Sequence, residues 1–291
     1  MENLIKDVTA NVLHVEPNNV EVAYRLMGGM SNFMYVVKVN GLQYTFRIPG
    51  KNAEVFVDRV EELENIKKVD VLHINNKTLY LDTKTGYKLA EYVEGVPLSD
   101  KENPEDYLNE VASVLKRLHE SNVSATKDYN PEGRLASYEQ LVLDLNFKHD
   151  PKYDELKSEF CTYLPELNKI EKVFCHNDSQ ISNIVVEGEQ VYLLDWEFGG
   201  NNDPLYDVAC VGNKEFELAV KFLPVYLGRD PKPSEFKRLY VWRAFQCLQW
   251  HNVAMYKELI GLSADLGVDF KFVSGLYLQK AEQFLKDARQ Y

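Results

Sequence analysis

The strongest constraint on this chain is a set of polar residues at fixed spacing among short apolar runs. His176, Asp178 and Asn183 lie between two such runs, and a third run leads into Asp195, twelve residues after Asn183. Two strands that flank one loop bring Asn183 and Asp195 together, with Asp178 facing the same space. Oxygen ligands are those that Mg²⁺ prefers, so Asn183 and Asp195 are predicted to bind this metal. The three apolar runs are Val173–Cys175, Ile184–Val186 and Val191–Leu194.

The segment from His176 to Asn183, with the form His-x-Asp-x₄-Asn, has the spacing of the kinase catalytic loop. In that loop the Asp orients the acceptor hydroxyl and accepts its proton, and the Asn binds a metal. Asp178 is therefore predicted to be the catalytic residue. His176 is the second catalytic candidate, and a structural bond to the loop backbone is the favoured interpretation for it. Polar turn residues between ordinary strands are the alternative for the whole segment.

Composition excludes several other classes of protein. The net charge is −12 over 291 residues, which argues against a nucleic-acid partner because such proteins carry a basic face. The four cysteines are widely spaced and form no CxxC pair, so a reducing compartment is expected. No apolar run approaches the ~18–20 residues that cross a bilayer. We therefore expect a cytoplasmic protein without a membrane partner, and the apolar helix faces do not indicate its oligomeric state.

The order of the expected elements predicts an α+β chain with a bilobal, protein-kinase-like fold. A β-rich N-terminal lobe over residues 1–93 would bind a nucleotide, and a mainly helical lobe over 94–291 would carry the catalytic and acceptor residues. Asn40-Gly41 is a strong hairpin signal between two of the strands. The expected strands of the first lobe are Val20–Met27, Phe33–Val39, Leu42–Ile48, Val71–Ile74, Thr78–Leu81 and Lys88–Val93, and the expected helices of the chain include Glu54–Lys68, Tyr107–Glu120, Ser137–Phe147 and Tyr153–Leu167.

Three segments resemble the choline/ethanolamine kinase family, which belongs to the wider group of aminoglycoside phosphotransferases. They are the turn Gly28–Asn32, the loop Cys175–Asn183 and the stretch Leu194–Asp207. The resemblance implies ATP and Mg²⁺ as cofactors, Asp178 as the catalytic base, and Asn183 and Asp195 as metal ligands. Asp207 resembles the family aspartate that supports the catalytic loop through hydrogen bonds, and an exposed acid at a helix start is its alternative.

The same resemblance implies a set of nucleotide-binding residues. The glycine-rich turn would lay backbone N–H groups over the phosphates, and a plain hairpin turn is its alternative. Arg47 stands where kinases hold a strand lysine, and Glu62 is its expected partner, although Glu61 or Glu64 could take that place. Glu91 and Val93 would contact the adenine. The nucleotide set is Gly28, Gly29, Ser31, Asn32, Arg47, Glu62, Glu91 and Val93.

For the acceptor, the resemblance implies a small amino alcohol, with choline favoured. Aromatic faces and nearby carboxylates suit a quaternary ammonium. The family places two tryptophans three residues apart on a late helix, and here Trp250 matches the first while Val253 replaces the second. Core packing is the alternative for Trp242, Phe245 and Tyr256. The predicted acceptor set is Glu197, Phe198, Glu215, Trp250 and Tyr277.

The resulting prediction is an ATP-dependent kinase that transfers the γ-phosphate to the hydroxyl of choline. A second hypothesis keeps the fold and changes the acceptor to ethanolamine, thiamine, a sugar or an aminoglycoside. A third is a relative that binds a nucleotide without catalysis. The presence of Asp178, Asn183 and Asp195 disfavours the third, because inactive relatives typically lose one of these residues.

Overall fold

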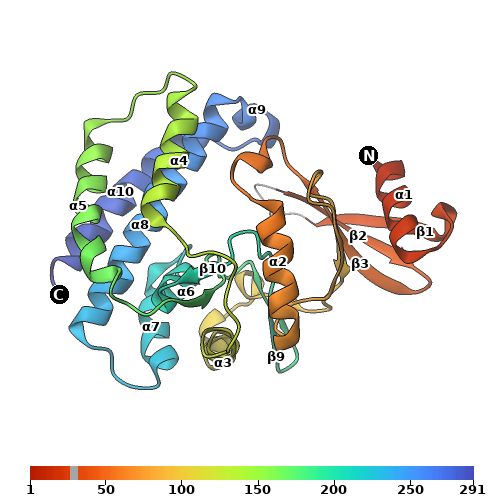
Figure 1. The fold of residues 1–291 in the computed structure, drawn as a ribbon, viewed down its shortest axis with the longest axis horizontal. Helices are drawn as coiled ribbons and strands as arrows, with labels where there is room; N and C mark the ends of the chain where they lie inside the picture. Colours follow the sequence, from red (N-terminus) through yellow and green to blue (C-terminus); the bar gives the residue numbers. More distant parts are fainter. Residues whose placement is uncertain (27–31) are drawn as a thin grey trace.

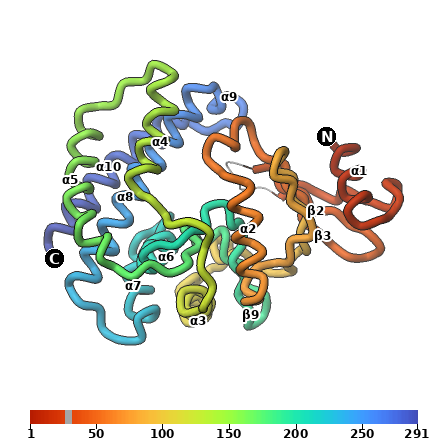
Figure 2. The backbone as a smooth tube through the Cα atoms, in the orientation of Figure 1, coloured from red at the N-terminus to blue at the C-terminus, as the bar shows by residue number. Residues whose placement is uncertain are grey.

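A computed structural model describes residues 1–26 and 32–291 (Figure 1). A twisted antiparallel sheet forms one side of the molecule, and helices form the other (Figure 2). Helix α2 (Arg59–Val69) runs between the two parts. Its buried Ile66 and Val69 belong to the larger core cluster, which lies mainly in the helical part. This arrangement is the predicted α+β fold.

The sheet of the N-terminal part has five strands in the order β1-β2-β3-β5-β4, all antiparallel. The predicted hairpin turn is present: Asn40 and Gly41 have φ angles of 50° and 83°, which a type I′ turn requires. Helix α1 (Glu2–Leu13) packs on this sheet through Ile5 and Ala10. The strands are β1 (Val20–Leu26), β2 (Asn32–Val39), β3 (Leu42–Pro49), β4 (Thr78–Leu81) and β5 (Lys88–Glu91).

Two predictions about this part were wrong in detail. The expected strand Val71–Ile74 is replaced by a 3-10 turn at Asp70–Leu72. His73 has a left-handed φ of 49°, which is incompatible with an extended strand, and Val71 is 68% exposed. The helix expected from residue 54 begins instead at Arg59, because the Asp58 carboxylate caps it by accepting from the N–H groups of Val60 and Glu61.

Two small antiparallel sheets connect the strands to the helices and carry the catalytic loop. One pairs β7 with β10, and the other has the order β6-β8-β9. The loop 176–183 runs from β7 to β8, and Asp195 follows β9, as the apolar runs predicted. These strands are β6 (Val96–Pro97), β7 (Val173–Cys175), β8 (Ile184–Glu187), β9 (Gln190–Leu193) and β10 (Gly200–Asn202).

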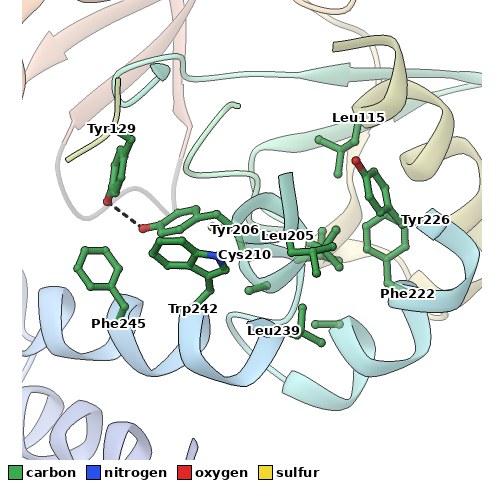
Figure 3. Packing of buried hydrophobic residues seen from close by; sticks show 14 of the residues in the cluster. Leu115, Tyr129, Leu205, Tyr206, Cys210, Phe222, Tyr226, Leu239, Trp242 and Phe245 are labelled. Atoms are coloured by element: carbon green, nitrogen blue, oxygen red, sulfur yellow. Dashed lines mark hydrogen bonds between the residues drawn. The ribbon is translucent and has the colours of Figure 1, made fainter. Parts of the chain in front are cut away.

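The remainder of the chain is helical and packs around the 27-residue helix α8 (Pro233–Leu259). Figure 3 shows Trp242 and Phe245 of this helix against Tyr206, which confirms core packing for both aromatic residues. Within the described ranges no helix is both long and apolar enough to cross a membrane. The other helices are α3 (Leu108–His119), α4 (Pro131–Leu143), α5 (Pro151–Leu167), α6 (Pro204–Val211), α7 (Phe216–Leu227), α9 (Leu262–Leu266) and α10 (Phe270–Ala288).

Helix α4 begins six residues before the expected Ser137. The Asn130 side chain accepts a hydrogen bond from the Gly133 N–H, and Pro131 occupies the first helical position. Both are ordinary helix-start signals, so this boundary was readable from the sequence. The earlier start matters for the site, because it places Arg134 in the first turn of α4.

Candidate active site

The catalytic loop brings Asp178 and Asn183 into direct contact. Asn183 Nδ2 donates hydrogen bonds to Asp178 Oδ2 at 3.0 Å and to the Asp178 carbonyl oxygen at 2.9 Å. The N–H of Leu194 donates to the Asn183 carbonyl at 2.8 Å. This backbone bond ties the end of β9 to the loop, so Asp195 follows directly beside Asn183. The three residues that the spacing singled out therefore share one site.

Asp207 holds the other end of this loop from beneath. Its carboxylate accepts bonds of 2.7 Å from the N–H groups of His176 and Asn177, and one of 2.9 Å from His119 Nε2. The side chain is fully buried, so the alternative of an exposed helix-start acid was wrong. Burial alone would raise the pKa of Asp207, but the hydrogen bond and charge of His119 hold it below its usual value. His119 was missed because it lies on an amphipathic helix far away in sequence.

His176 makes bonds with the loop backbone through both ring nitrogens. The Asp178 N–H donates to Nδ1 at 3.2 Å, so Nε2 carries the proton and donates to the Leu194 carbonyl at 2.9 Å. Burial lowers the pKa of His176 to about 4, and the ring is therefore neutral. This arrangement matches the structural role favoured for His176. Both ring nitrogens are used by the loop backbone, so neither is free to contact the phosphoryl acceptor.

A buried cluster of ions joins the sheet, α2 and the segment after Asp195. Arg47 Nη1 and Nη2 donate to both carboxylate oxygens of Glu62 at 2.6 and 2.9 Å, so the expected ion pair is present. Arg59 Nη1 also contacts Glu62 at 2.7 Å and reaches Glu197 Oε1 at 2.5 Å. Burial would raise the pKa of Glu62, but Arg47 and Lys88 hold it at about 2. Glu62 is therefore ionised and fixes Arg47.

Lys88 and Arg59 are members of this cluster that the sequence analysis missed. Lys88 lies opposite Arg47 in the β3–β5 pairing, and its Nζ is 3.8 Å from Glu62. Burial lowers the pKa of Lys88. The identity of the partner strand was the missing information, because β5 pairs with β3 only in the folded sheet. A lysine beside the apolar Leu89 and Ala90 was the one available signal.

Asp195 is only weakly compensated by positive charge. Its only ion pair within the described ranges is a 3.7 Å contact with Arg47, and 36% of its side chain is accessible. Loss of hydration, followed by the negative charge of Glu197, raises the pKa of Asp195 to about 7. Its φ of 67° is a left-handed conformation that Asp tolerates. A nearby cation would therefore stabilise the ionised form of Asp195.

These contacts allow a test of whether a metal fits the site. Glu62, Asp195 and Glu197 have carboxylate oxygens within 4.8 Å of one another, but Glu62 and Glu197 already accept bonds from guanidinium groups. Asn183 directs its amide nitrogen to Asp178, which leaves its amide oxygen for another partner. Asp195 and Asn183 therefore offer two hard oxygen ligands, and these suit Mg²⁺.

Of the predicted phosphate-turn residues, Gly28, Gly29 and Ser31 lie outside the described ranges. Asn32 is described at the start of β2, and its Nδ2 donates to Glu197 Oε1 at 2.9 Å. Glu197 thus accepts bonds from Asn32, Arg47 and Arg59. Its carboxylate anchors the sheet to the segment after Asp195 and is already compensated by cations.

At the expected hinge, the backbone groups of Glu91 are engaged within the protein. Its N–H donates to the Lys77 carbonyl, and its carbonyl accepts from Asn76 Nδ2, both at 2.9 Å. Glu91 and Val93 also line a second cavity of about 470 Å³. Glu91 therefore uses its backbone groups within the protein, and contact of Val93 with an adenine stays a prediction.

A cavity of about 280 Å³ lies beside Asp178. It is lined by the predicted residues Asp178, Glu197, Phe198 and Trp250, and by Val253, which replaces the family's second tryptophan. Further aromatic residues reach it from β2, the 50–57 segment, the residues before α4 and helices α4, α6 and α8, which sequence order does not connect. These additional aromatic residues are Phe33, Phe56, Tyr129, Tyr138, Tyr206 and Tyr256.

Two predicted acceptor residues lie away from this cavity lining. Glu215 is an exposed residue directly before α7. Tyr277 stacks on Trp250 from α10, with ring centroids 6.4 Å apart and planes inclined by 25°, and packs against the main core. Tyr277 therefore packs behind Trp250 and supports it. Glu215 is exposed to solvent because it lies at the N-cap of α7, before the first buried residues of that helix.

Solved structures with this architecture define the class of fold. Choline kinase LicA from Streptococcus pneumoniae matches with a TM-score of 0.79 over 99% of both chains, at 23% identity. A structure of LicA in complex with AMP matches with a TM-score of 0.77 over 98% of this chain and 99% of that chain, at 22% identity. This chain therefore has the fold of choline kinases, which is the predicted kinase-like fold.

The sequence places the chain more narrowly. The profile of the choline/ethanolamine kinase family matches residues 23–226, and the chain belongs to this family of phosphotransferases. Protein LicA of Haemophilus influenzae is 28% identical over 251 residues, which cover 81% of this chain and 74% of that protein. Membership implies a nucleotide as phosphoryl donor and an amino alcohol as acceptor.

Proposed function

We propose that this enzyme transfers the γ-phosphate of ATP, with Mg²⁺, to the hydroxyl of choline. One observation carries the proposal: Asp178 lines the same cavity as a group of aromatic side chains that includes Phe198 and Trp250. An acceptor in this cavity has its hydroxyl beside a carboxylate and its ammonium against aromatic faces.

Asp178 is the residue that we assign to the acceptor hydroxyl. Burial, followed by the charges of Asp195 and Glu197, raises the pKa of its carboxyl well above the usual value. A raised pKa makes a carboxylate a stronger proton acceptor. The bond from Asn183 Nδ2 to Asp178 Oδ2 orients the carboxylate. Asp178 would position the hydroxyl and take up its proton as the new O–P bond forms.

We assign Asn183 and Asp195 to Mg²⁺, because their side chains offer two hard oxygen ligands. When bound, Mg·ATP supplies the phosphoryl group and neutralises its charge. Arg47 is a rigid, permanently charged group at the same end of the site, since Glu62 holds it bidentately. Its N–H groups are used by Glu62, Glu197 and the Gly86 carbonyl. We propose that Arg47 contributes fixed positive charge beside the phosphates and that residues 1–93 form the nucleotide-binding lobe.

The composition of the cavity supports choline over acceptors rich in hydroxyl groups. A trimethylammonium group cannot donate hydrogen bonds and is stabilised by aromatic faces. Val253 keeps the wall beside Trp250 apolar. Polar residues such as Asn177 and Gln249 also line the cavity, so the aromatic and apolar walls are what favour choline in this proposal.

The test is an acceptor screen by ADP release with Mg·ATP. Choline, ethanolamine, thiamine, a hexose and an aminoglycoside are compared at equal concentration. We expect the highest kcat/KM with choline. Faster turnover of any other acceptor would assign the cavity to that compound, and ADP release from none of them, with Mg·ATP bound, would favour a non-catalytic relative.

A further inference from the structure

The acceptor cavity already holds a cation that belongs to the protein. The guanidinium carbon of Arg134 lies 4.7 Å from the ring centroid of Phe198, 5.0 Å from that of Tyr129 and 5.4 Å from that of Tyr138. These distances are within the range of cation–π contacts. We call the three rings the aromatic cage. All three, and Arg134 itself, line the cavity that contains Asp178.

Arg134 has an unusual set of partners for a half-buried arginine. Its Nη2 donates to the Tyr138 hydroxyl at 2.7 Å. Its Nε is buried without a hydrogen-bond partner, and no described carboxylate forms an ion pair with it. Buried arginines are ordinarily paired with carboxylates, because an unpaired buried charge is costly. The aromatic cage is therefore the main compensation for this charge.

The aromatic cage has the chemistry that a quaternary ammonium needs. Guanidinium and trimethylammonium groups are both weakly hydrated cations, and both are stabilised by the faces of aromatic rings. The cage lies in the cavity where the proposed acceptor would bind beside Asp178. Two positive charges do not share such a small cage, since they repel each other at short distance.

We propose that Arg134 is an internal cation that occupies the ammonium site of the empty enzyme and leaves it when the acceptor binds. The inference rests on the proposed function, because it requires an acceptor with a cationic end. It makes Arg134 a determinant of specificity. A neutral alcohol gains no cation–π stabilisation in the aromatic cage and cannot compete with Arg134 for it, whereas a trimethylammonium group can. The apparent affinity for the acceptor is reduced by the fraction of enzyme in which Arg134 fills the cage.

The variant Arg134→Gln removes the charge and keeps an amide that can donate to Tyr138. Arg25→Gln is the matched control, because Arg25 lines the same cavity but stacks on Phe33, outside the aromatic cage. Tetramethylammonium is the probe, titrated by calorimetry, since it has the cationic group and no hydroxyl. We expect the Kd of tetramethylammonium to be at least roughly fivefold lower for Arg134→Gln than for Arg25→Gln. Equal affinities, or weaker binding to Arg134→Gln, would overturn the inference.

A second measurement needs only the wild-type protein and covers the case in which Arg134→Gln does not fold. The Arg134 guanidinium lies against three rings, so ring currents should shift its Nε–H NMR signal away from those of other arginines. Saturating tetramethylammonium should move that signal toward the ordinary arginine position. A signal that keeps its shift while the probe binds would overturn the inference.

These experiments separate the inference from the proposed function. If choline is phosphorylated while tetramethylammonium binds both variants equally, the displacement of Arg134 is wrong and the function stands. If choline is not phosphorylated but tetramethylammonium displaces Arg134, the function is wrong and the cation site stands.

Discussion

The Asp178 carboxylate accepts a 3.0 Å hydrogen bond from the amide nitrogen of Asn183. The bond links the residue assigned to the acceptor hydroxyl with one assigned to the metal. It also orients the Asn183 amide, because a nitrogen directed to Asp178 leaves the oxygen for a cation. This single contact thus links binding of the acceptor hydroxyl to binding of the metal.

Replacing Asp178 with Asn should lower kcat at least ~10²-fold with choline, because a general base contributes about this much. The fold should be retained, since the amide has the same shape and removes a charge from a site crowded with acids. Steady-state ADP release measures the effect, and circular dichroism checks the fold. Asp144→Asn, at an exposed position, is the control. If the Asp178→Asn variant is as active as this control, Asp178 is not the general base.

Replacing Glu62 with Gln should destabilise the protein by about 3–5 kcal/mol, because it leaves buried Arg47 and Arg59 with too little negative charge. Urea unfolding measures the difference. The control is Glu64→Gln on the exposed side of the same helix, for which we expect a change of at most about 0.5 kcal/mol. Equal stability of the two variants would mean that the cluster is compensated in another way.

The pH dependence of stability should show the buried, neutral His176. Its folded pKa of about 4 lies below the ordinary histidine value of 6.5, so the unfolded state binds the proton more readily. The contribution of His176 is fully present above pH 6.5 and decreases as the pH falls towards 4, by about 2 kcal/mol at pH 5. Thermal unfolding at pH 7 and pH 5 measures it.

The variant His176→Gln should lose this part of the pH dependence, while His14→Gln, at an exposed position, should behave as the wild type. If His176→Gln and the wild type lose the same stability between pH 7 and pH 5, then His176 does not titrate as described.

Trp250→Ala should raise the KM for choline about tenfold and change kcat less, since a cation–π contact acts on binding. Phe272→Ala is the control, because Phe272 is 66% exposed on α10. Initial rates over a range of choline concentrations give both constants. A loss confined to kcat would place Trp250 in the support of the catalytic loop instead of the acceptor cavity.

The sequence predicted those parts of the site in which local pattern and spacing decide the geometry. Asn183 and Asp195 lie side by side because only the β8–β9 hairpin separates them. Arg47 and Glu62 meet because a strand and the next helix pack together. His119 was missed, since its contact with Asp207 depends on how α3 packs beneath the loop.

Other features depended on tertiary contacts that no local pattern contains. The apolar residues of Val71–Ile74 predicted a strand, but only Ile74 is buried there. The Ile74 carbonyl accepts a hydrogen bond from the N–H of Leu193. The aromatic cage around Arg134 combines residues from before α4, from α4 and from after Asp195. Glu215, which the sequence placed in the acceptor set, lies at the surface.

The most direct test of the account is a crystal structure with Mg²⁺, a non-hydrolysable ATP analogue and choline. The account predicts Mg²⁺ bound by Asn183 and Asp195, with the choline hydroxyl within ~2.6–3.2 Å of the Asp178 carboxylate. A metal bound instead by Glu62 and Glu197, or choline outside the cavity beside Asp178, would contradict it.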